Sequence, residues 1–352
     1  MRNAPVTEQE SALGGLMENP RQYPVSQEWK EKALEAVDGR LVLVSLSGGK
    51  DSTAVALLMK ELGIKYKCVH FDTGWEHRDT EDYVRQYLPK HVGPVEIVRN
   101  EKYGGMRGLV LKKGMFPSRV RRFCTQELKI FPFMRYLKQY HERLEDPINA
   151  IGIRAEESLA RSRMPEWEEN EKFHCEVWRP LIRWTLEDVV EIHRRHGVEP
   201  NPLYLRGAER VGCWPCIFAR KAEIRFVAET DPARIDEIEE LERQIAEAAR
   251  ERLAKRGETF ESLGYTEPTF FMGFRGGKWR KKKMLPIREA VEWARTKRGG
   301  MEKDHDDDFV TKMRDSGCLR WGLCDMATEH AETKKRQMEL FEGISGEPEG
   351  ER

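Results

Sequence analysis

Short apolar runs alternate with amphipathic segments along the first half of the chain. Four runs have strand composition and are too short for helices; they are residues 41–44, 65–71, 95–98 and 148–153. Helical spacing between and around them predicts helices over residues 28–37, 53–58, 79–88, 124–140 and 186–195. Strands that alternate with helices form parallel sheets covered on both faces. We therefore predict an α/β, Rossmann-like fold.

The second half has a different pattern. Residues 155–177 are polar, and we expect a mobile loop over the site. A long amphipathic helix is predicted over residues 231–255, with apolar positions at Ile235, Ile238, Leu241, Ile245 and Leu253. The predicted organisation is an N-terminal arm and helix (1–38), an α/β domain (39–220), a mainly helical extension (221–342) and a disordered tail (343–352).

Composition narrows the class of protein. Of the 352 residues, 39% are hydrophobic and 35% are charged. The 61 Lys and Arg residues balance the 61 Asp and Glu residues, so the net charge of the whole chain does not indicate a nucleic-acid partner. No apolar run approaches the roughly 20 residues that span a membrane, and the first residues lack the apolar core of a signal peptide. Seven cysteines, an odd number, argue against a disulfide framework. We expect a cytoplasmic protein without a membrane partner.

The segment Ser47-Gly48-Gly49-Lys50-Asp51-Ser52 joins the first predicted strand to a helix. Backbone N–H groups and the dipole at a helix N-terminus favour an anion there, and glycines allow a phosphate to approach closely. The spacing differs from that of the Walker loop, GxxxxGK[ST]. The alternative is an ordinary glycine-containing turn.

Two further polar stretches follow predicted strands: DTGWE at residues 72–76 and GIRAEES at residues 152–158. The carboxyl ends of parallel strands share one edge of the sheet, where ligands of such folds bind. The sequence therefore predicts that three separate stretches converge on one crevice.

Five motifs in order carry a family resemblance: SLSGGKDSTA, FDTGWEHRDTEDYV, GIRAEESLARSR, RPLIRWTLEDVVEIH and NPLYLRGAERVGCWPC. Over roughly residues 40–220 the chain resembles the phosphoadenosine-phosphosulfate (PAPS) reductase family, a branch of the N-type ATP pyrophosphatase (PP-loop) superfamily. The resemblance implies an adenine nucleotide alpha hydrolase-like fold and an ATP site.

The resemblance also implies site residues. Those for the nucleotide are Ser45, Ser47, Gly48, Gly49, Lys50, Asp51, Ser52, Asp72, Thr73, Gly152, Arg154, Arg161 and Arg163. Lys50 and Asp51 would be catalytic, and Mg²⁺ would bridge phosphate oxygens with Asp51 or Asp72 as partner. Asp72 could instead cap the following segment, and any of the arginines could form a solvated salt bridge.

Three cysteines fit the pattern of the family's iron–sulfur branch, in which a Cys-Cys pair and a distant CxxC hold a [4Fe–4S] cluster. They are Cys124, Cys213 and Cys216, while Phe123 replaces the first member of the pair. The fourth ligand would be Cys318 or Cys324, or the position stays open. Zn²⁺ is the alternative metal by spacing alone. Arg121, Arg122 and Arg210 would offset the negative charge of the thiolates.

The C-terminal half departs from the reductases. These carry a reactive cysteine in an ECGLH-like segment, of which Cys318–Asp325 keeps only Gly-Leu, and their Arg-x-Gly-Arg-Trp stretch is missing after the CxxC. The departures favour the members that activate a polymer with ATP and insert sulfur, as in DNA phosphorothioation. Cys318 or Cys324 would then carry sulfur as a persulfide.

A basic cluster near residue 280 supports a nucleic-acid partner. Its members are Arg275, Lys278, Trp279, Arg280, Lys281, Lys282 and Lys283, which suit phosphates and base stacking. A solvated basic face is the alternative. The other partners implied are a sulfur donor such as a cysteine desulfurase and further subunits of a modification system. Two other functions stay open: a PAPS or adenylyl-sulfate reductase and a non-catalytic nucleotide-binding subunit.

Overall fold

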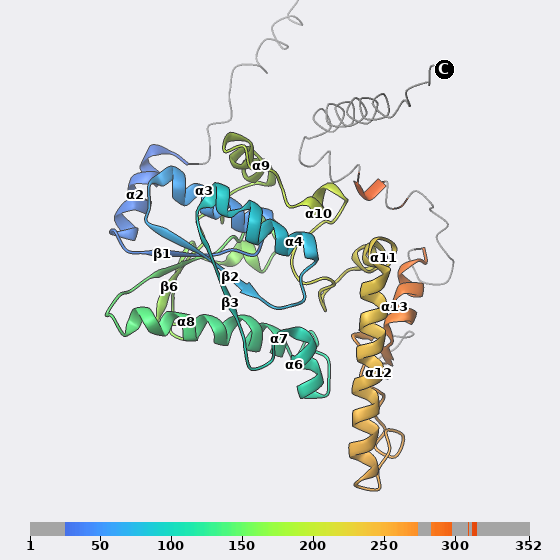
Figure 1. Ribbon diagram of the computed structural model, residues 1–352. Helices are drawn as coiled ribbons and strands as arrows, with labels where there is room; N and C mark the ends of the chain where they lie inside the picture. The colour runs from blue at the N-terminus through green and yellow to red at the C-terminus, as the bar shows by residue number, and fades with distance from the viewer. Residues whose placement is uncertain (1–24, 274–282, 298–308, 310–311, 315–352) are drawn as a thin grey trace, which may run out of the picture.

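The computed structural model describes residues 25–273, 283–297, 309 and 312–314 (Figure 1). Several predicted features lie outside these residues. They are the first 24 residues of the N-terminal arm, the basic cluster from Arg275 to Lys282 with the side chain of Lys283, both Cys318 and Cys324, and the tail. None of the described helices is long and apolar enough to cross a lipid bilayer.

A six-stranded sheet forms the centre of the molecule, in the order β3-β2-β1-β4-β6-β5. Its strands are β1 (Val42–Ser45), β2 (Tyr66–Asp72), β3 (Val95–Arg99), β4 (Ile148–Ala150), β5 (Trp167–Asn170) and β6 (Cys175–Trp178). All neighbours are parallel except β5 and β6. In the central register Val42 pairs with both Tyr66 and Ile148. The predicted α/β, Rossmann-like class is confirmed.

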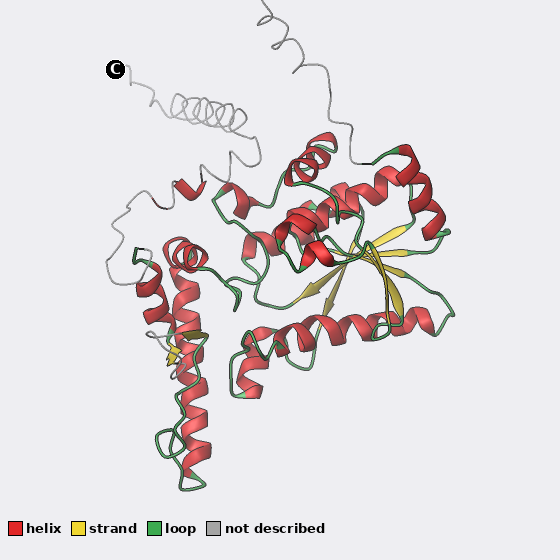
Figure 2. Cartoon of the chain, turned by 180° about the vertical axis from the view of Figure 1, so that it is seen from behind, coloured by secondary structure: helices red, strands yellow, loops and turns green. Residues whose placement is uncertain are grey.

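Helices cover both faces of this sheet (Figures 1 and 2). One face carries α2 (Gln27–Val37), α3 (Lys50–Leu62) and α9 (Leu186–Arg195), and the other carries α8 (Phe131–His141). Val44 joins the core under α3, whereas its neighbour Leu43 joins the core under α8. Because successive strand residues point to opposite faces, one apolar run fills two cores.

Shorter helices connect the layers. They are α4 (Arg78–Asp82), α5 (Pro89–Val92), α6 (Met106–Lys113), α7 (Phe123–Thr125) and α10 (Pro202–Leu205). Short 3-10 turns lie at Ala155–Glu157 and Arg161–Arg163. Two predicted helices each contain a π-helical turn, at Tyr83–Tyr87 and Gln126–Ile130. The helices predicted over residues 79–88 and 124–140 are therefore present but divided.

The prediction of a mobile loop over residues 155–177 was wrong. Much of this stretch forms the antiparallel hairpin of β5 and β6, and β6 extends the sheet parallel to β4. Trp167 and Trp178 stack across the hairpin with ring centroids 4.8 Å apart. The side chain of Cys175 is buried in β6. The largely polar strand β5 pairs here because its Trp167 packs against Trp178 in the core on the α3 face of the sheet.

The described part of the C-terminal extension, residues 221–273 and 283–297, consists largely of helices. It contains α11 (Lys221–Thr230), α12 (Pro232–Ala254), α13 (Ile287–Ala294) and the two-stranded sheet of β7 (Phe271–Gly273) and β8 (Lys283–Leu285). Ile238 and Leu241 of α12 share a second core with Trp75, Leu109 and other residues of the sheet domain. The extension therefore packs against the domain on the side of its strand ends (Figure 2).

Glu242 on α12 makes the stability of this second core depend on pH. Its carboxylate is buried and accepts backbone N–H bonds from Phe270 and Ile287. Burial raises the pKa of Glu242 to about 7, above its ordinary 4.5, although the two N–H donors oppose the shift. The folded state therefore binds the proton more tightly than the unfolded chain. Stability from this group is fully present below pH 4.5 and is lost as pH rises through 7.

We expect the free energy of unfolding to fall by about 3 kcal/mol between these pH values, through this group alone. Urea unfolding across the range measures it. Glu242→Gln, which cannot ionise, should flatten the dependence, and an unchanged pH profile in that variant would contradict the assignment.

Candidate nucleotide and cysteine site

The phosphate loop is held by its own side chains. The Ser47 N–H donates to Ser52 Oγ over 3.0 Å, and Ser52 Oγ in turn donates to the carbonyl of Gly49. Gly48 has φ +75°, and a Cβ there would lie 2.7 Å from a methyl carbon of Val84. Glycine is therefore required at this turn both for its backbone conformation and for space.

Lys50 begins α3 and lies over the loop. Its ammonium is 3.3 Å from Asp51 Oδ2 and 5.3 Å from the ring centre of Tyr204. The Tyr204 hydroxyl accepts the Lys50 backbone N–H. Burial lowers the pKa of Lys50, but Tyr204 and Asp51 outweigh it, and the pKa is raised overall. Lys50 thus stays protonated at neutral pH and lies at the loop that is predicted to bind phosphate.

The strand end after β4 packs directly on the loop. A Cβ at Gly152 would come within 2.6 Å of the Asp51 backbone, so only glycine fits. Arg154 is buried, and its Nε donates to Asp51 Oδ1 over 2.5 Å. Its guanidinium also pairs with Glu156. In this arrangement Arg154 orders the start of α3 through Asp51.

Sequence reasoning missed Asn201. This buried amide donates to the carbonyl of Gly48 over 3.2 Å and to Thr80 Oγ1 over 3.3 Å, while its own oxygen accepts the N–H of Leu203. Asn201 therefore ties the loop at Gly48 to α4 at Thr80. The signal was present in the NPLY stretch, where asparagine before proline is typical of a helix N-cap.

An apolar cleft of about 210 Å³ opens beside the loop. Ser45 and Ser47 line one end, and Lys129 and Gly212 line it as well. The other lining residues are Leu46, His70, Phe71, Glu76, Ile130, Phe133, Asn149 and Phe173. Because Gly212 directly precedes Cys213, the cleft connects the phosphate loop with the CxxC segment.

Asp72 and Thr73 lie at the predicted strand end but are buried. Asp72 accepts from Arg85 over 2.7 Å, and the Thr73 hydroxyl donates to Glu76 over 2.6 Å. Neither side chain lines the cleft. Their role in nucleotide binding stays a prediction. In the structure both side chains hold the turn after β2 through these contacts.

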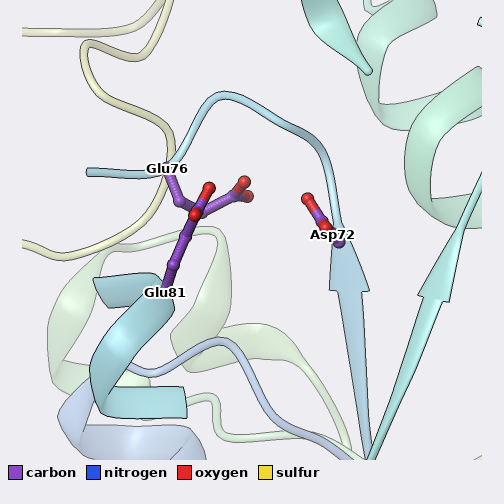
Figure 3. A group of neighbouring side chains, drawn as sticks. All are labelled: Asp72, Glu76 and Glu81. Atoms are coloured by element: carbon purple, nitrogen blue, oxygen red, sulfur yellow. The ribbon is translucent and has the colours of Figure 1, made fainter. Parts of the chain in front are cut away.

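Three carboxylates gather at this turn: Asp72, Glu76 and Glu81 (Figure 3), each with an oxygen within 4.8 Å of the others. Burial and the two neighbouring carboxylates raise the pKa of Glu81. Such a group can hold a divalent cation. Arg85 and Arg99, however, already lie against Asp72 and supply positive charge.

The three predicted metal-ligand cysteines lie near one another, and Gly212 of the cleft lining directly precedes one of them. Cys124 lies in α7, and the charges of Cys124, Cys213 and Cys216 act on one another and on Lys129. Burial raises the pKa of the Cys213 thiol to about 11, and Lys129 opposes the rise. Burial lowers the pKa of Arg210, but Cys216 and other groups outweigh it.

Lys129 and Arg210 are thus the cations beside the thiols. The sequence predicts Arg210, Arg121 and Arg122 as cations that offset the charge of the thiolates, and it does not identify Lys129. Arg121 is exposed, and the Arg122 guanidinium lies over the ring of Phe218, 4.4 Å from its centre.

Backbone contacts join the DTGWE turn to the CxxC segment. The Trp214 N–H donates to the carbonyl of Trp75 over 2.8 Å, and the Trp75 indole N–H donates to the carbonyl of Pro215. Glu76 and Cys213 form an isolated antiparallel bridge. The second of the three predicted strand ends therefore positions the cysteines.

Two predicted arginines remain outside this centre. Arg161 pairs with Glu157 in the 3-10 region, and Arg163 is exposed. The structure does not bring either to the phosphate loop through a contact among the described residues. Their role stays a prediction.

The described residues thus combine a glycine-containing loop between β1 and α3 with a group of three cysteines. The chain belongs to the phosphoadenosine phosphosulfate reductase domain family, whose pattern matches residues 41–219. It is 31% identical to an uncharacterised 37.8 kDa protein of Escherichia phage 186, over 74% of this chain and 90% of the relative. It is 26% identical to adenosine 5'-phosphosulfate reductase of Allochromatium vinosum, over 50% of this chain and 67% of the relative.

Two further relatives are matched over only part of their length. The chain spans 52% and 42% of the length of two uncharacterised Methanocaldococcus jannaschii relatives, at 27% and 28% identity. Among solved structures, it is similar to a PAPS reductase from Candida auris, with 17% identity and a TM-score of 0.42 over 60% of this chain and 98% of that one.

Proposed function

We propose that the chain is an ATP-dependent sulfur-transfer enzyme that adenylates a nucleic-acid acceptor, with the DNA backbone as that acceptor. One observation supports it above all: the same cleft is lined by Ser45 and Ser47 at the loop and by Gly212, the residue before Cys213. A nucleotide bound at the loop would place its activated product within reach of a sulfur site.

In the first step, an acceptor phosphate oxygen attacks the α-phosphorus of ATP, and pyrophosphate leaves. Lys50 and the loop N–H groups stabilise the charge that develops on the transferring phosphate, and Asn201 keeps the loop in position. Mg²⁺ would accompany ATP and neutralise its phosphates. Asp51 is held by Lys50 and Arg154, so its part is to order the loop.

In the second step, hydrosulfide attacks the adenylated acceptor phosphorus. The new P–S bond forms, the P–O bond to AMP breaks, and one proton is released. No electrons are exchanged when the donor is hydrosulfide; a persulfide donor on Cys318 or Cys324 would need a two-electron thiol reductant.

The cysteine group suits a cluster better than a single ion. Cys124, Cys213 and Cys216 do not place all three sulfurs within 4.8 Å of one another, whereas sulfurs on one Zn²⁺ lie no more than about 4.6 Å apart. The neighbouring cations Lys129 and Arg210 suit an anionic thiolate cluster. A [4Fe–4S] cluster held by these residues would supply an iron that can bind sulfide.

The test is pyrophosphate release from ATP by anaerobically purified protein, with and without DNA, followed by digestion of the DNA and detection of phosphorothioate linkages. We expect release that rises with DNA and linkages that require a sulfide source. Pyrophosphate release that DNA does not change, without any linkage, would exclude DNA as the acceptor.

A second candidate function is reduction of an adenylyl sulfate to sulfite. The similarity to adenosine 5'-phosphosulfate reductases favours it. Sulfite release with a thiol reductant, and no cleavage of ATP, would establish this function in place of the first. Nucleotide binding without any turnover would instead indicate a non-catalytic subunit.

A further inference from the structure

A compact turn presents arginines beside Cys124. The Ser118 N–H donates to the carbonyl of Arg121, and the Arg121 N–H donates to Ser118 Oγ, each over 3.1 Å. The turn exposes Arg119 and Arg121, and Val120 between them is 79% exposed. Two hydrogen bonds within four residues therefore fix the backbone of the turn that carries these side chains.

Phe218 organises two of the neighbouring guanidinium groups. The guanidinium carbon of Arg122 lies 4.4 Å from the ring centre and that of Arg119 lies 5.7 Å from it. Phe218 follows Cys216 by two positions, and Arg122 precedes Cys124 by two. The segments that carry the cysteines therefore also build this basic surface, at the same place in the fold.

These arginines have no internal counter-charge. Among residues 25–273 and the other described positions, no ion pair includes Arg119, Arg121 or Arg122. Nearby acids are engaged elsewhere, since Glu223 pairs with Arg210. Ordered, unpaired guanidinium groups are suited to phosphate oxygens, which they bind in a bidentate fashion.

We propose that Arg119 and Arg122, which lie over the ring of Phe218, form together with the exposed Arg121 a docking surface for the phosphodiester backbone of a nucleic acid. This inference rests on the proposed function, and it specifies the surface along which the acceptor strand reaches the site. The surface differs from the basic cluster near residue 280. A backbone bound here would pass the cysteine end of the cleft, where the acceptor phosphate must meet both adenylate and sulfur.

The experiment measures binding of a fluorescent single-stranded DNA oligonucleotide by anisotropy, over a series of salt concentrations and without ATP. Arg119→Ala with Arg121→Ala should weaken binding roughly tenfold or more at low salt. The slope of log K against log salt should become less steep by about 1.4, because each lost phosphate contact contributes about 0.7. Arg122 is left intact so that its packing on the ring of Phe218 is kept in the variant.

Arg143→Ala is the matched control. Arg143 is an exposed arginine over an aromatic ring, that of Tyr140, and lies at the opposite end of α8. It should leave affinity and slope unchanged. The double variant Arg119→Lys with Arg121→Lys keeps both charges and should retain most of the slope of log K against log salt. It therefore distinguishes an effect of lost charge from an effect of misfolding.

The outcomes distinguish the surface from the function. An unchanged slope in the double alanine variant, with DNA-stimulated pyrophosphate release intact, would overturn the docking surface and leave the proposed function standing. Equal losses in the variant and in Arg143→Ala would also overturn it. Binding of an acidic protein but not of DNA would overturn both the surface and the DNA acceptor.

Discussion

Lys50→Ala is expected to lower pyrophosphate release from ATP by about 10²- to 10³-fold. The Lys50 ammonium is a raised-pKa cation held over the loop by Asp51 and Tyr204, so it stays charged and fixed at the position where phosphate charge develops. A preorganised donor of this kind acts mostly in the transition state. Steady-state assays with saturating ATP measure the loss.

Lys60→Ala is the control for this variant. Lys60 lies on the same helix and is exposed, with its ammonium bonded to the carbonyl of His91. It should keep wild-type activity. Activity of Lys50→Ala within a few-fold of wild type, in a protein that unfolds at the same temperature, would show that the loop is not the reaction centre.

Cys213→Ala is expected to remove the bound metal. Cys213 directly follows Gly212 of the cleft lining, and burial raises the pKa of its thiol to about 11 although the neighbouring Lys129 opposes the rise. We expect wild-type protein, purified without oxygen, to contain about four irons per chain with matching sulfide. The variant should contain almost none and lose the visible absorbance of the cluster.

Cys68→Ala provides the comparison. Cys68 is buried in β2, and burial raises its pKa to about 12, far from any role as a thiolate. Its metal content should equal that of wild type. One zinc per wild-type chain in place of iron would contradict the cluster, and full iron in Cys213→Ala would contradict the ligand assignment.

The sequence predicted the fold because its strands are apolar runs and its loop has a distinctive glycine pattern. The hairpin of β5 and β6 escaped prediction because its outer residues, such as Glu168 and Glu169, are charged. Its stability comes from Trp167 and Trp178, which meet only after the chain has folded. Local patterns cannot show partners of this kind.

Sequence reasoning identified candidate residues whose chemistry is distinctive, and it missed residues whose part depends on their position in the fold. The thiols and the glycine-containing loop carry recognisable chemistry, and the cleft beside the loop is also lined by Gly212, the neighbour of Cys213. Asn201 and Lys129 act through position alone, since an amide and an ammonium occur on any surface. Arg154 is the converse case: it was expected at the substrate but is occupied by Asp51 and Glu156.

The second core crosses the boundary of the family domain. Trp75 and Trp214 lie within residues 41–219, whereas Ile238, Leu241 and Phe270 belong to the extension, yet all five share one buried cluster. The family domain of this chain is therefore not a self-sufficient module. Exchanging it with that of another family member would leave apolar surfaces of the extension without their partners at Trp75 and Trp214.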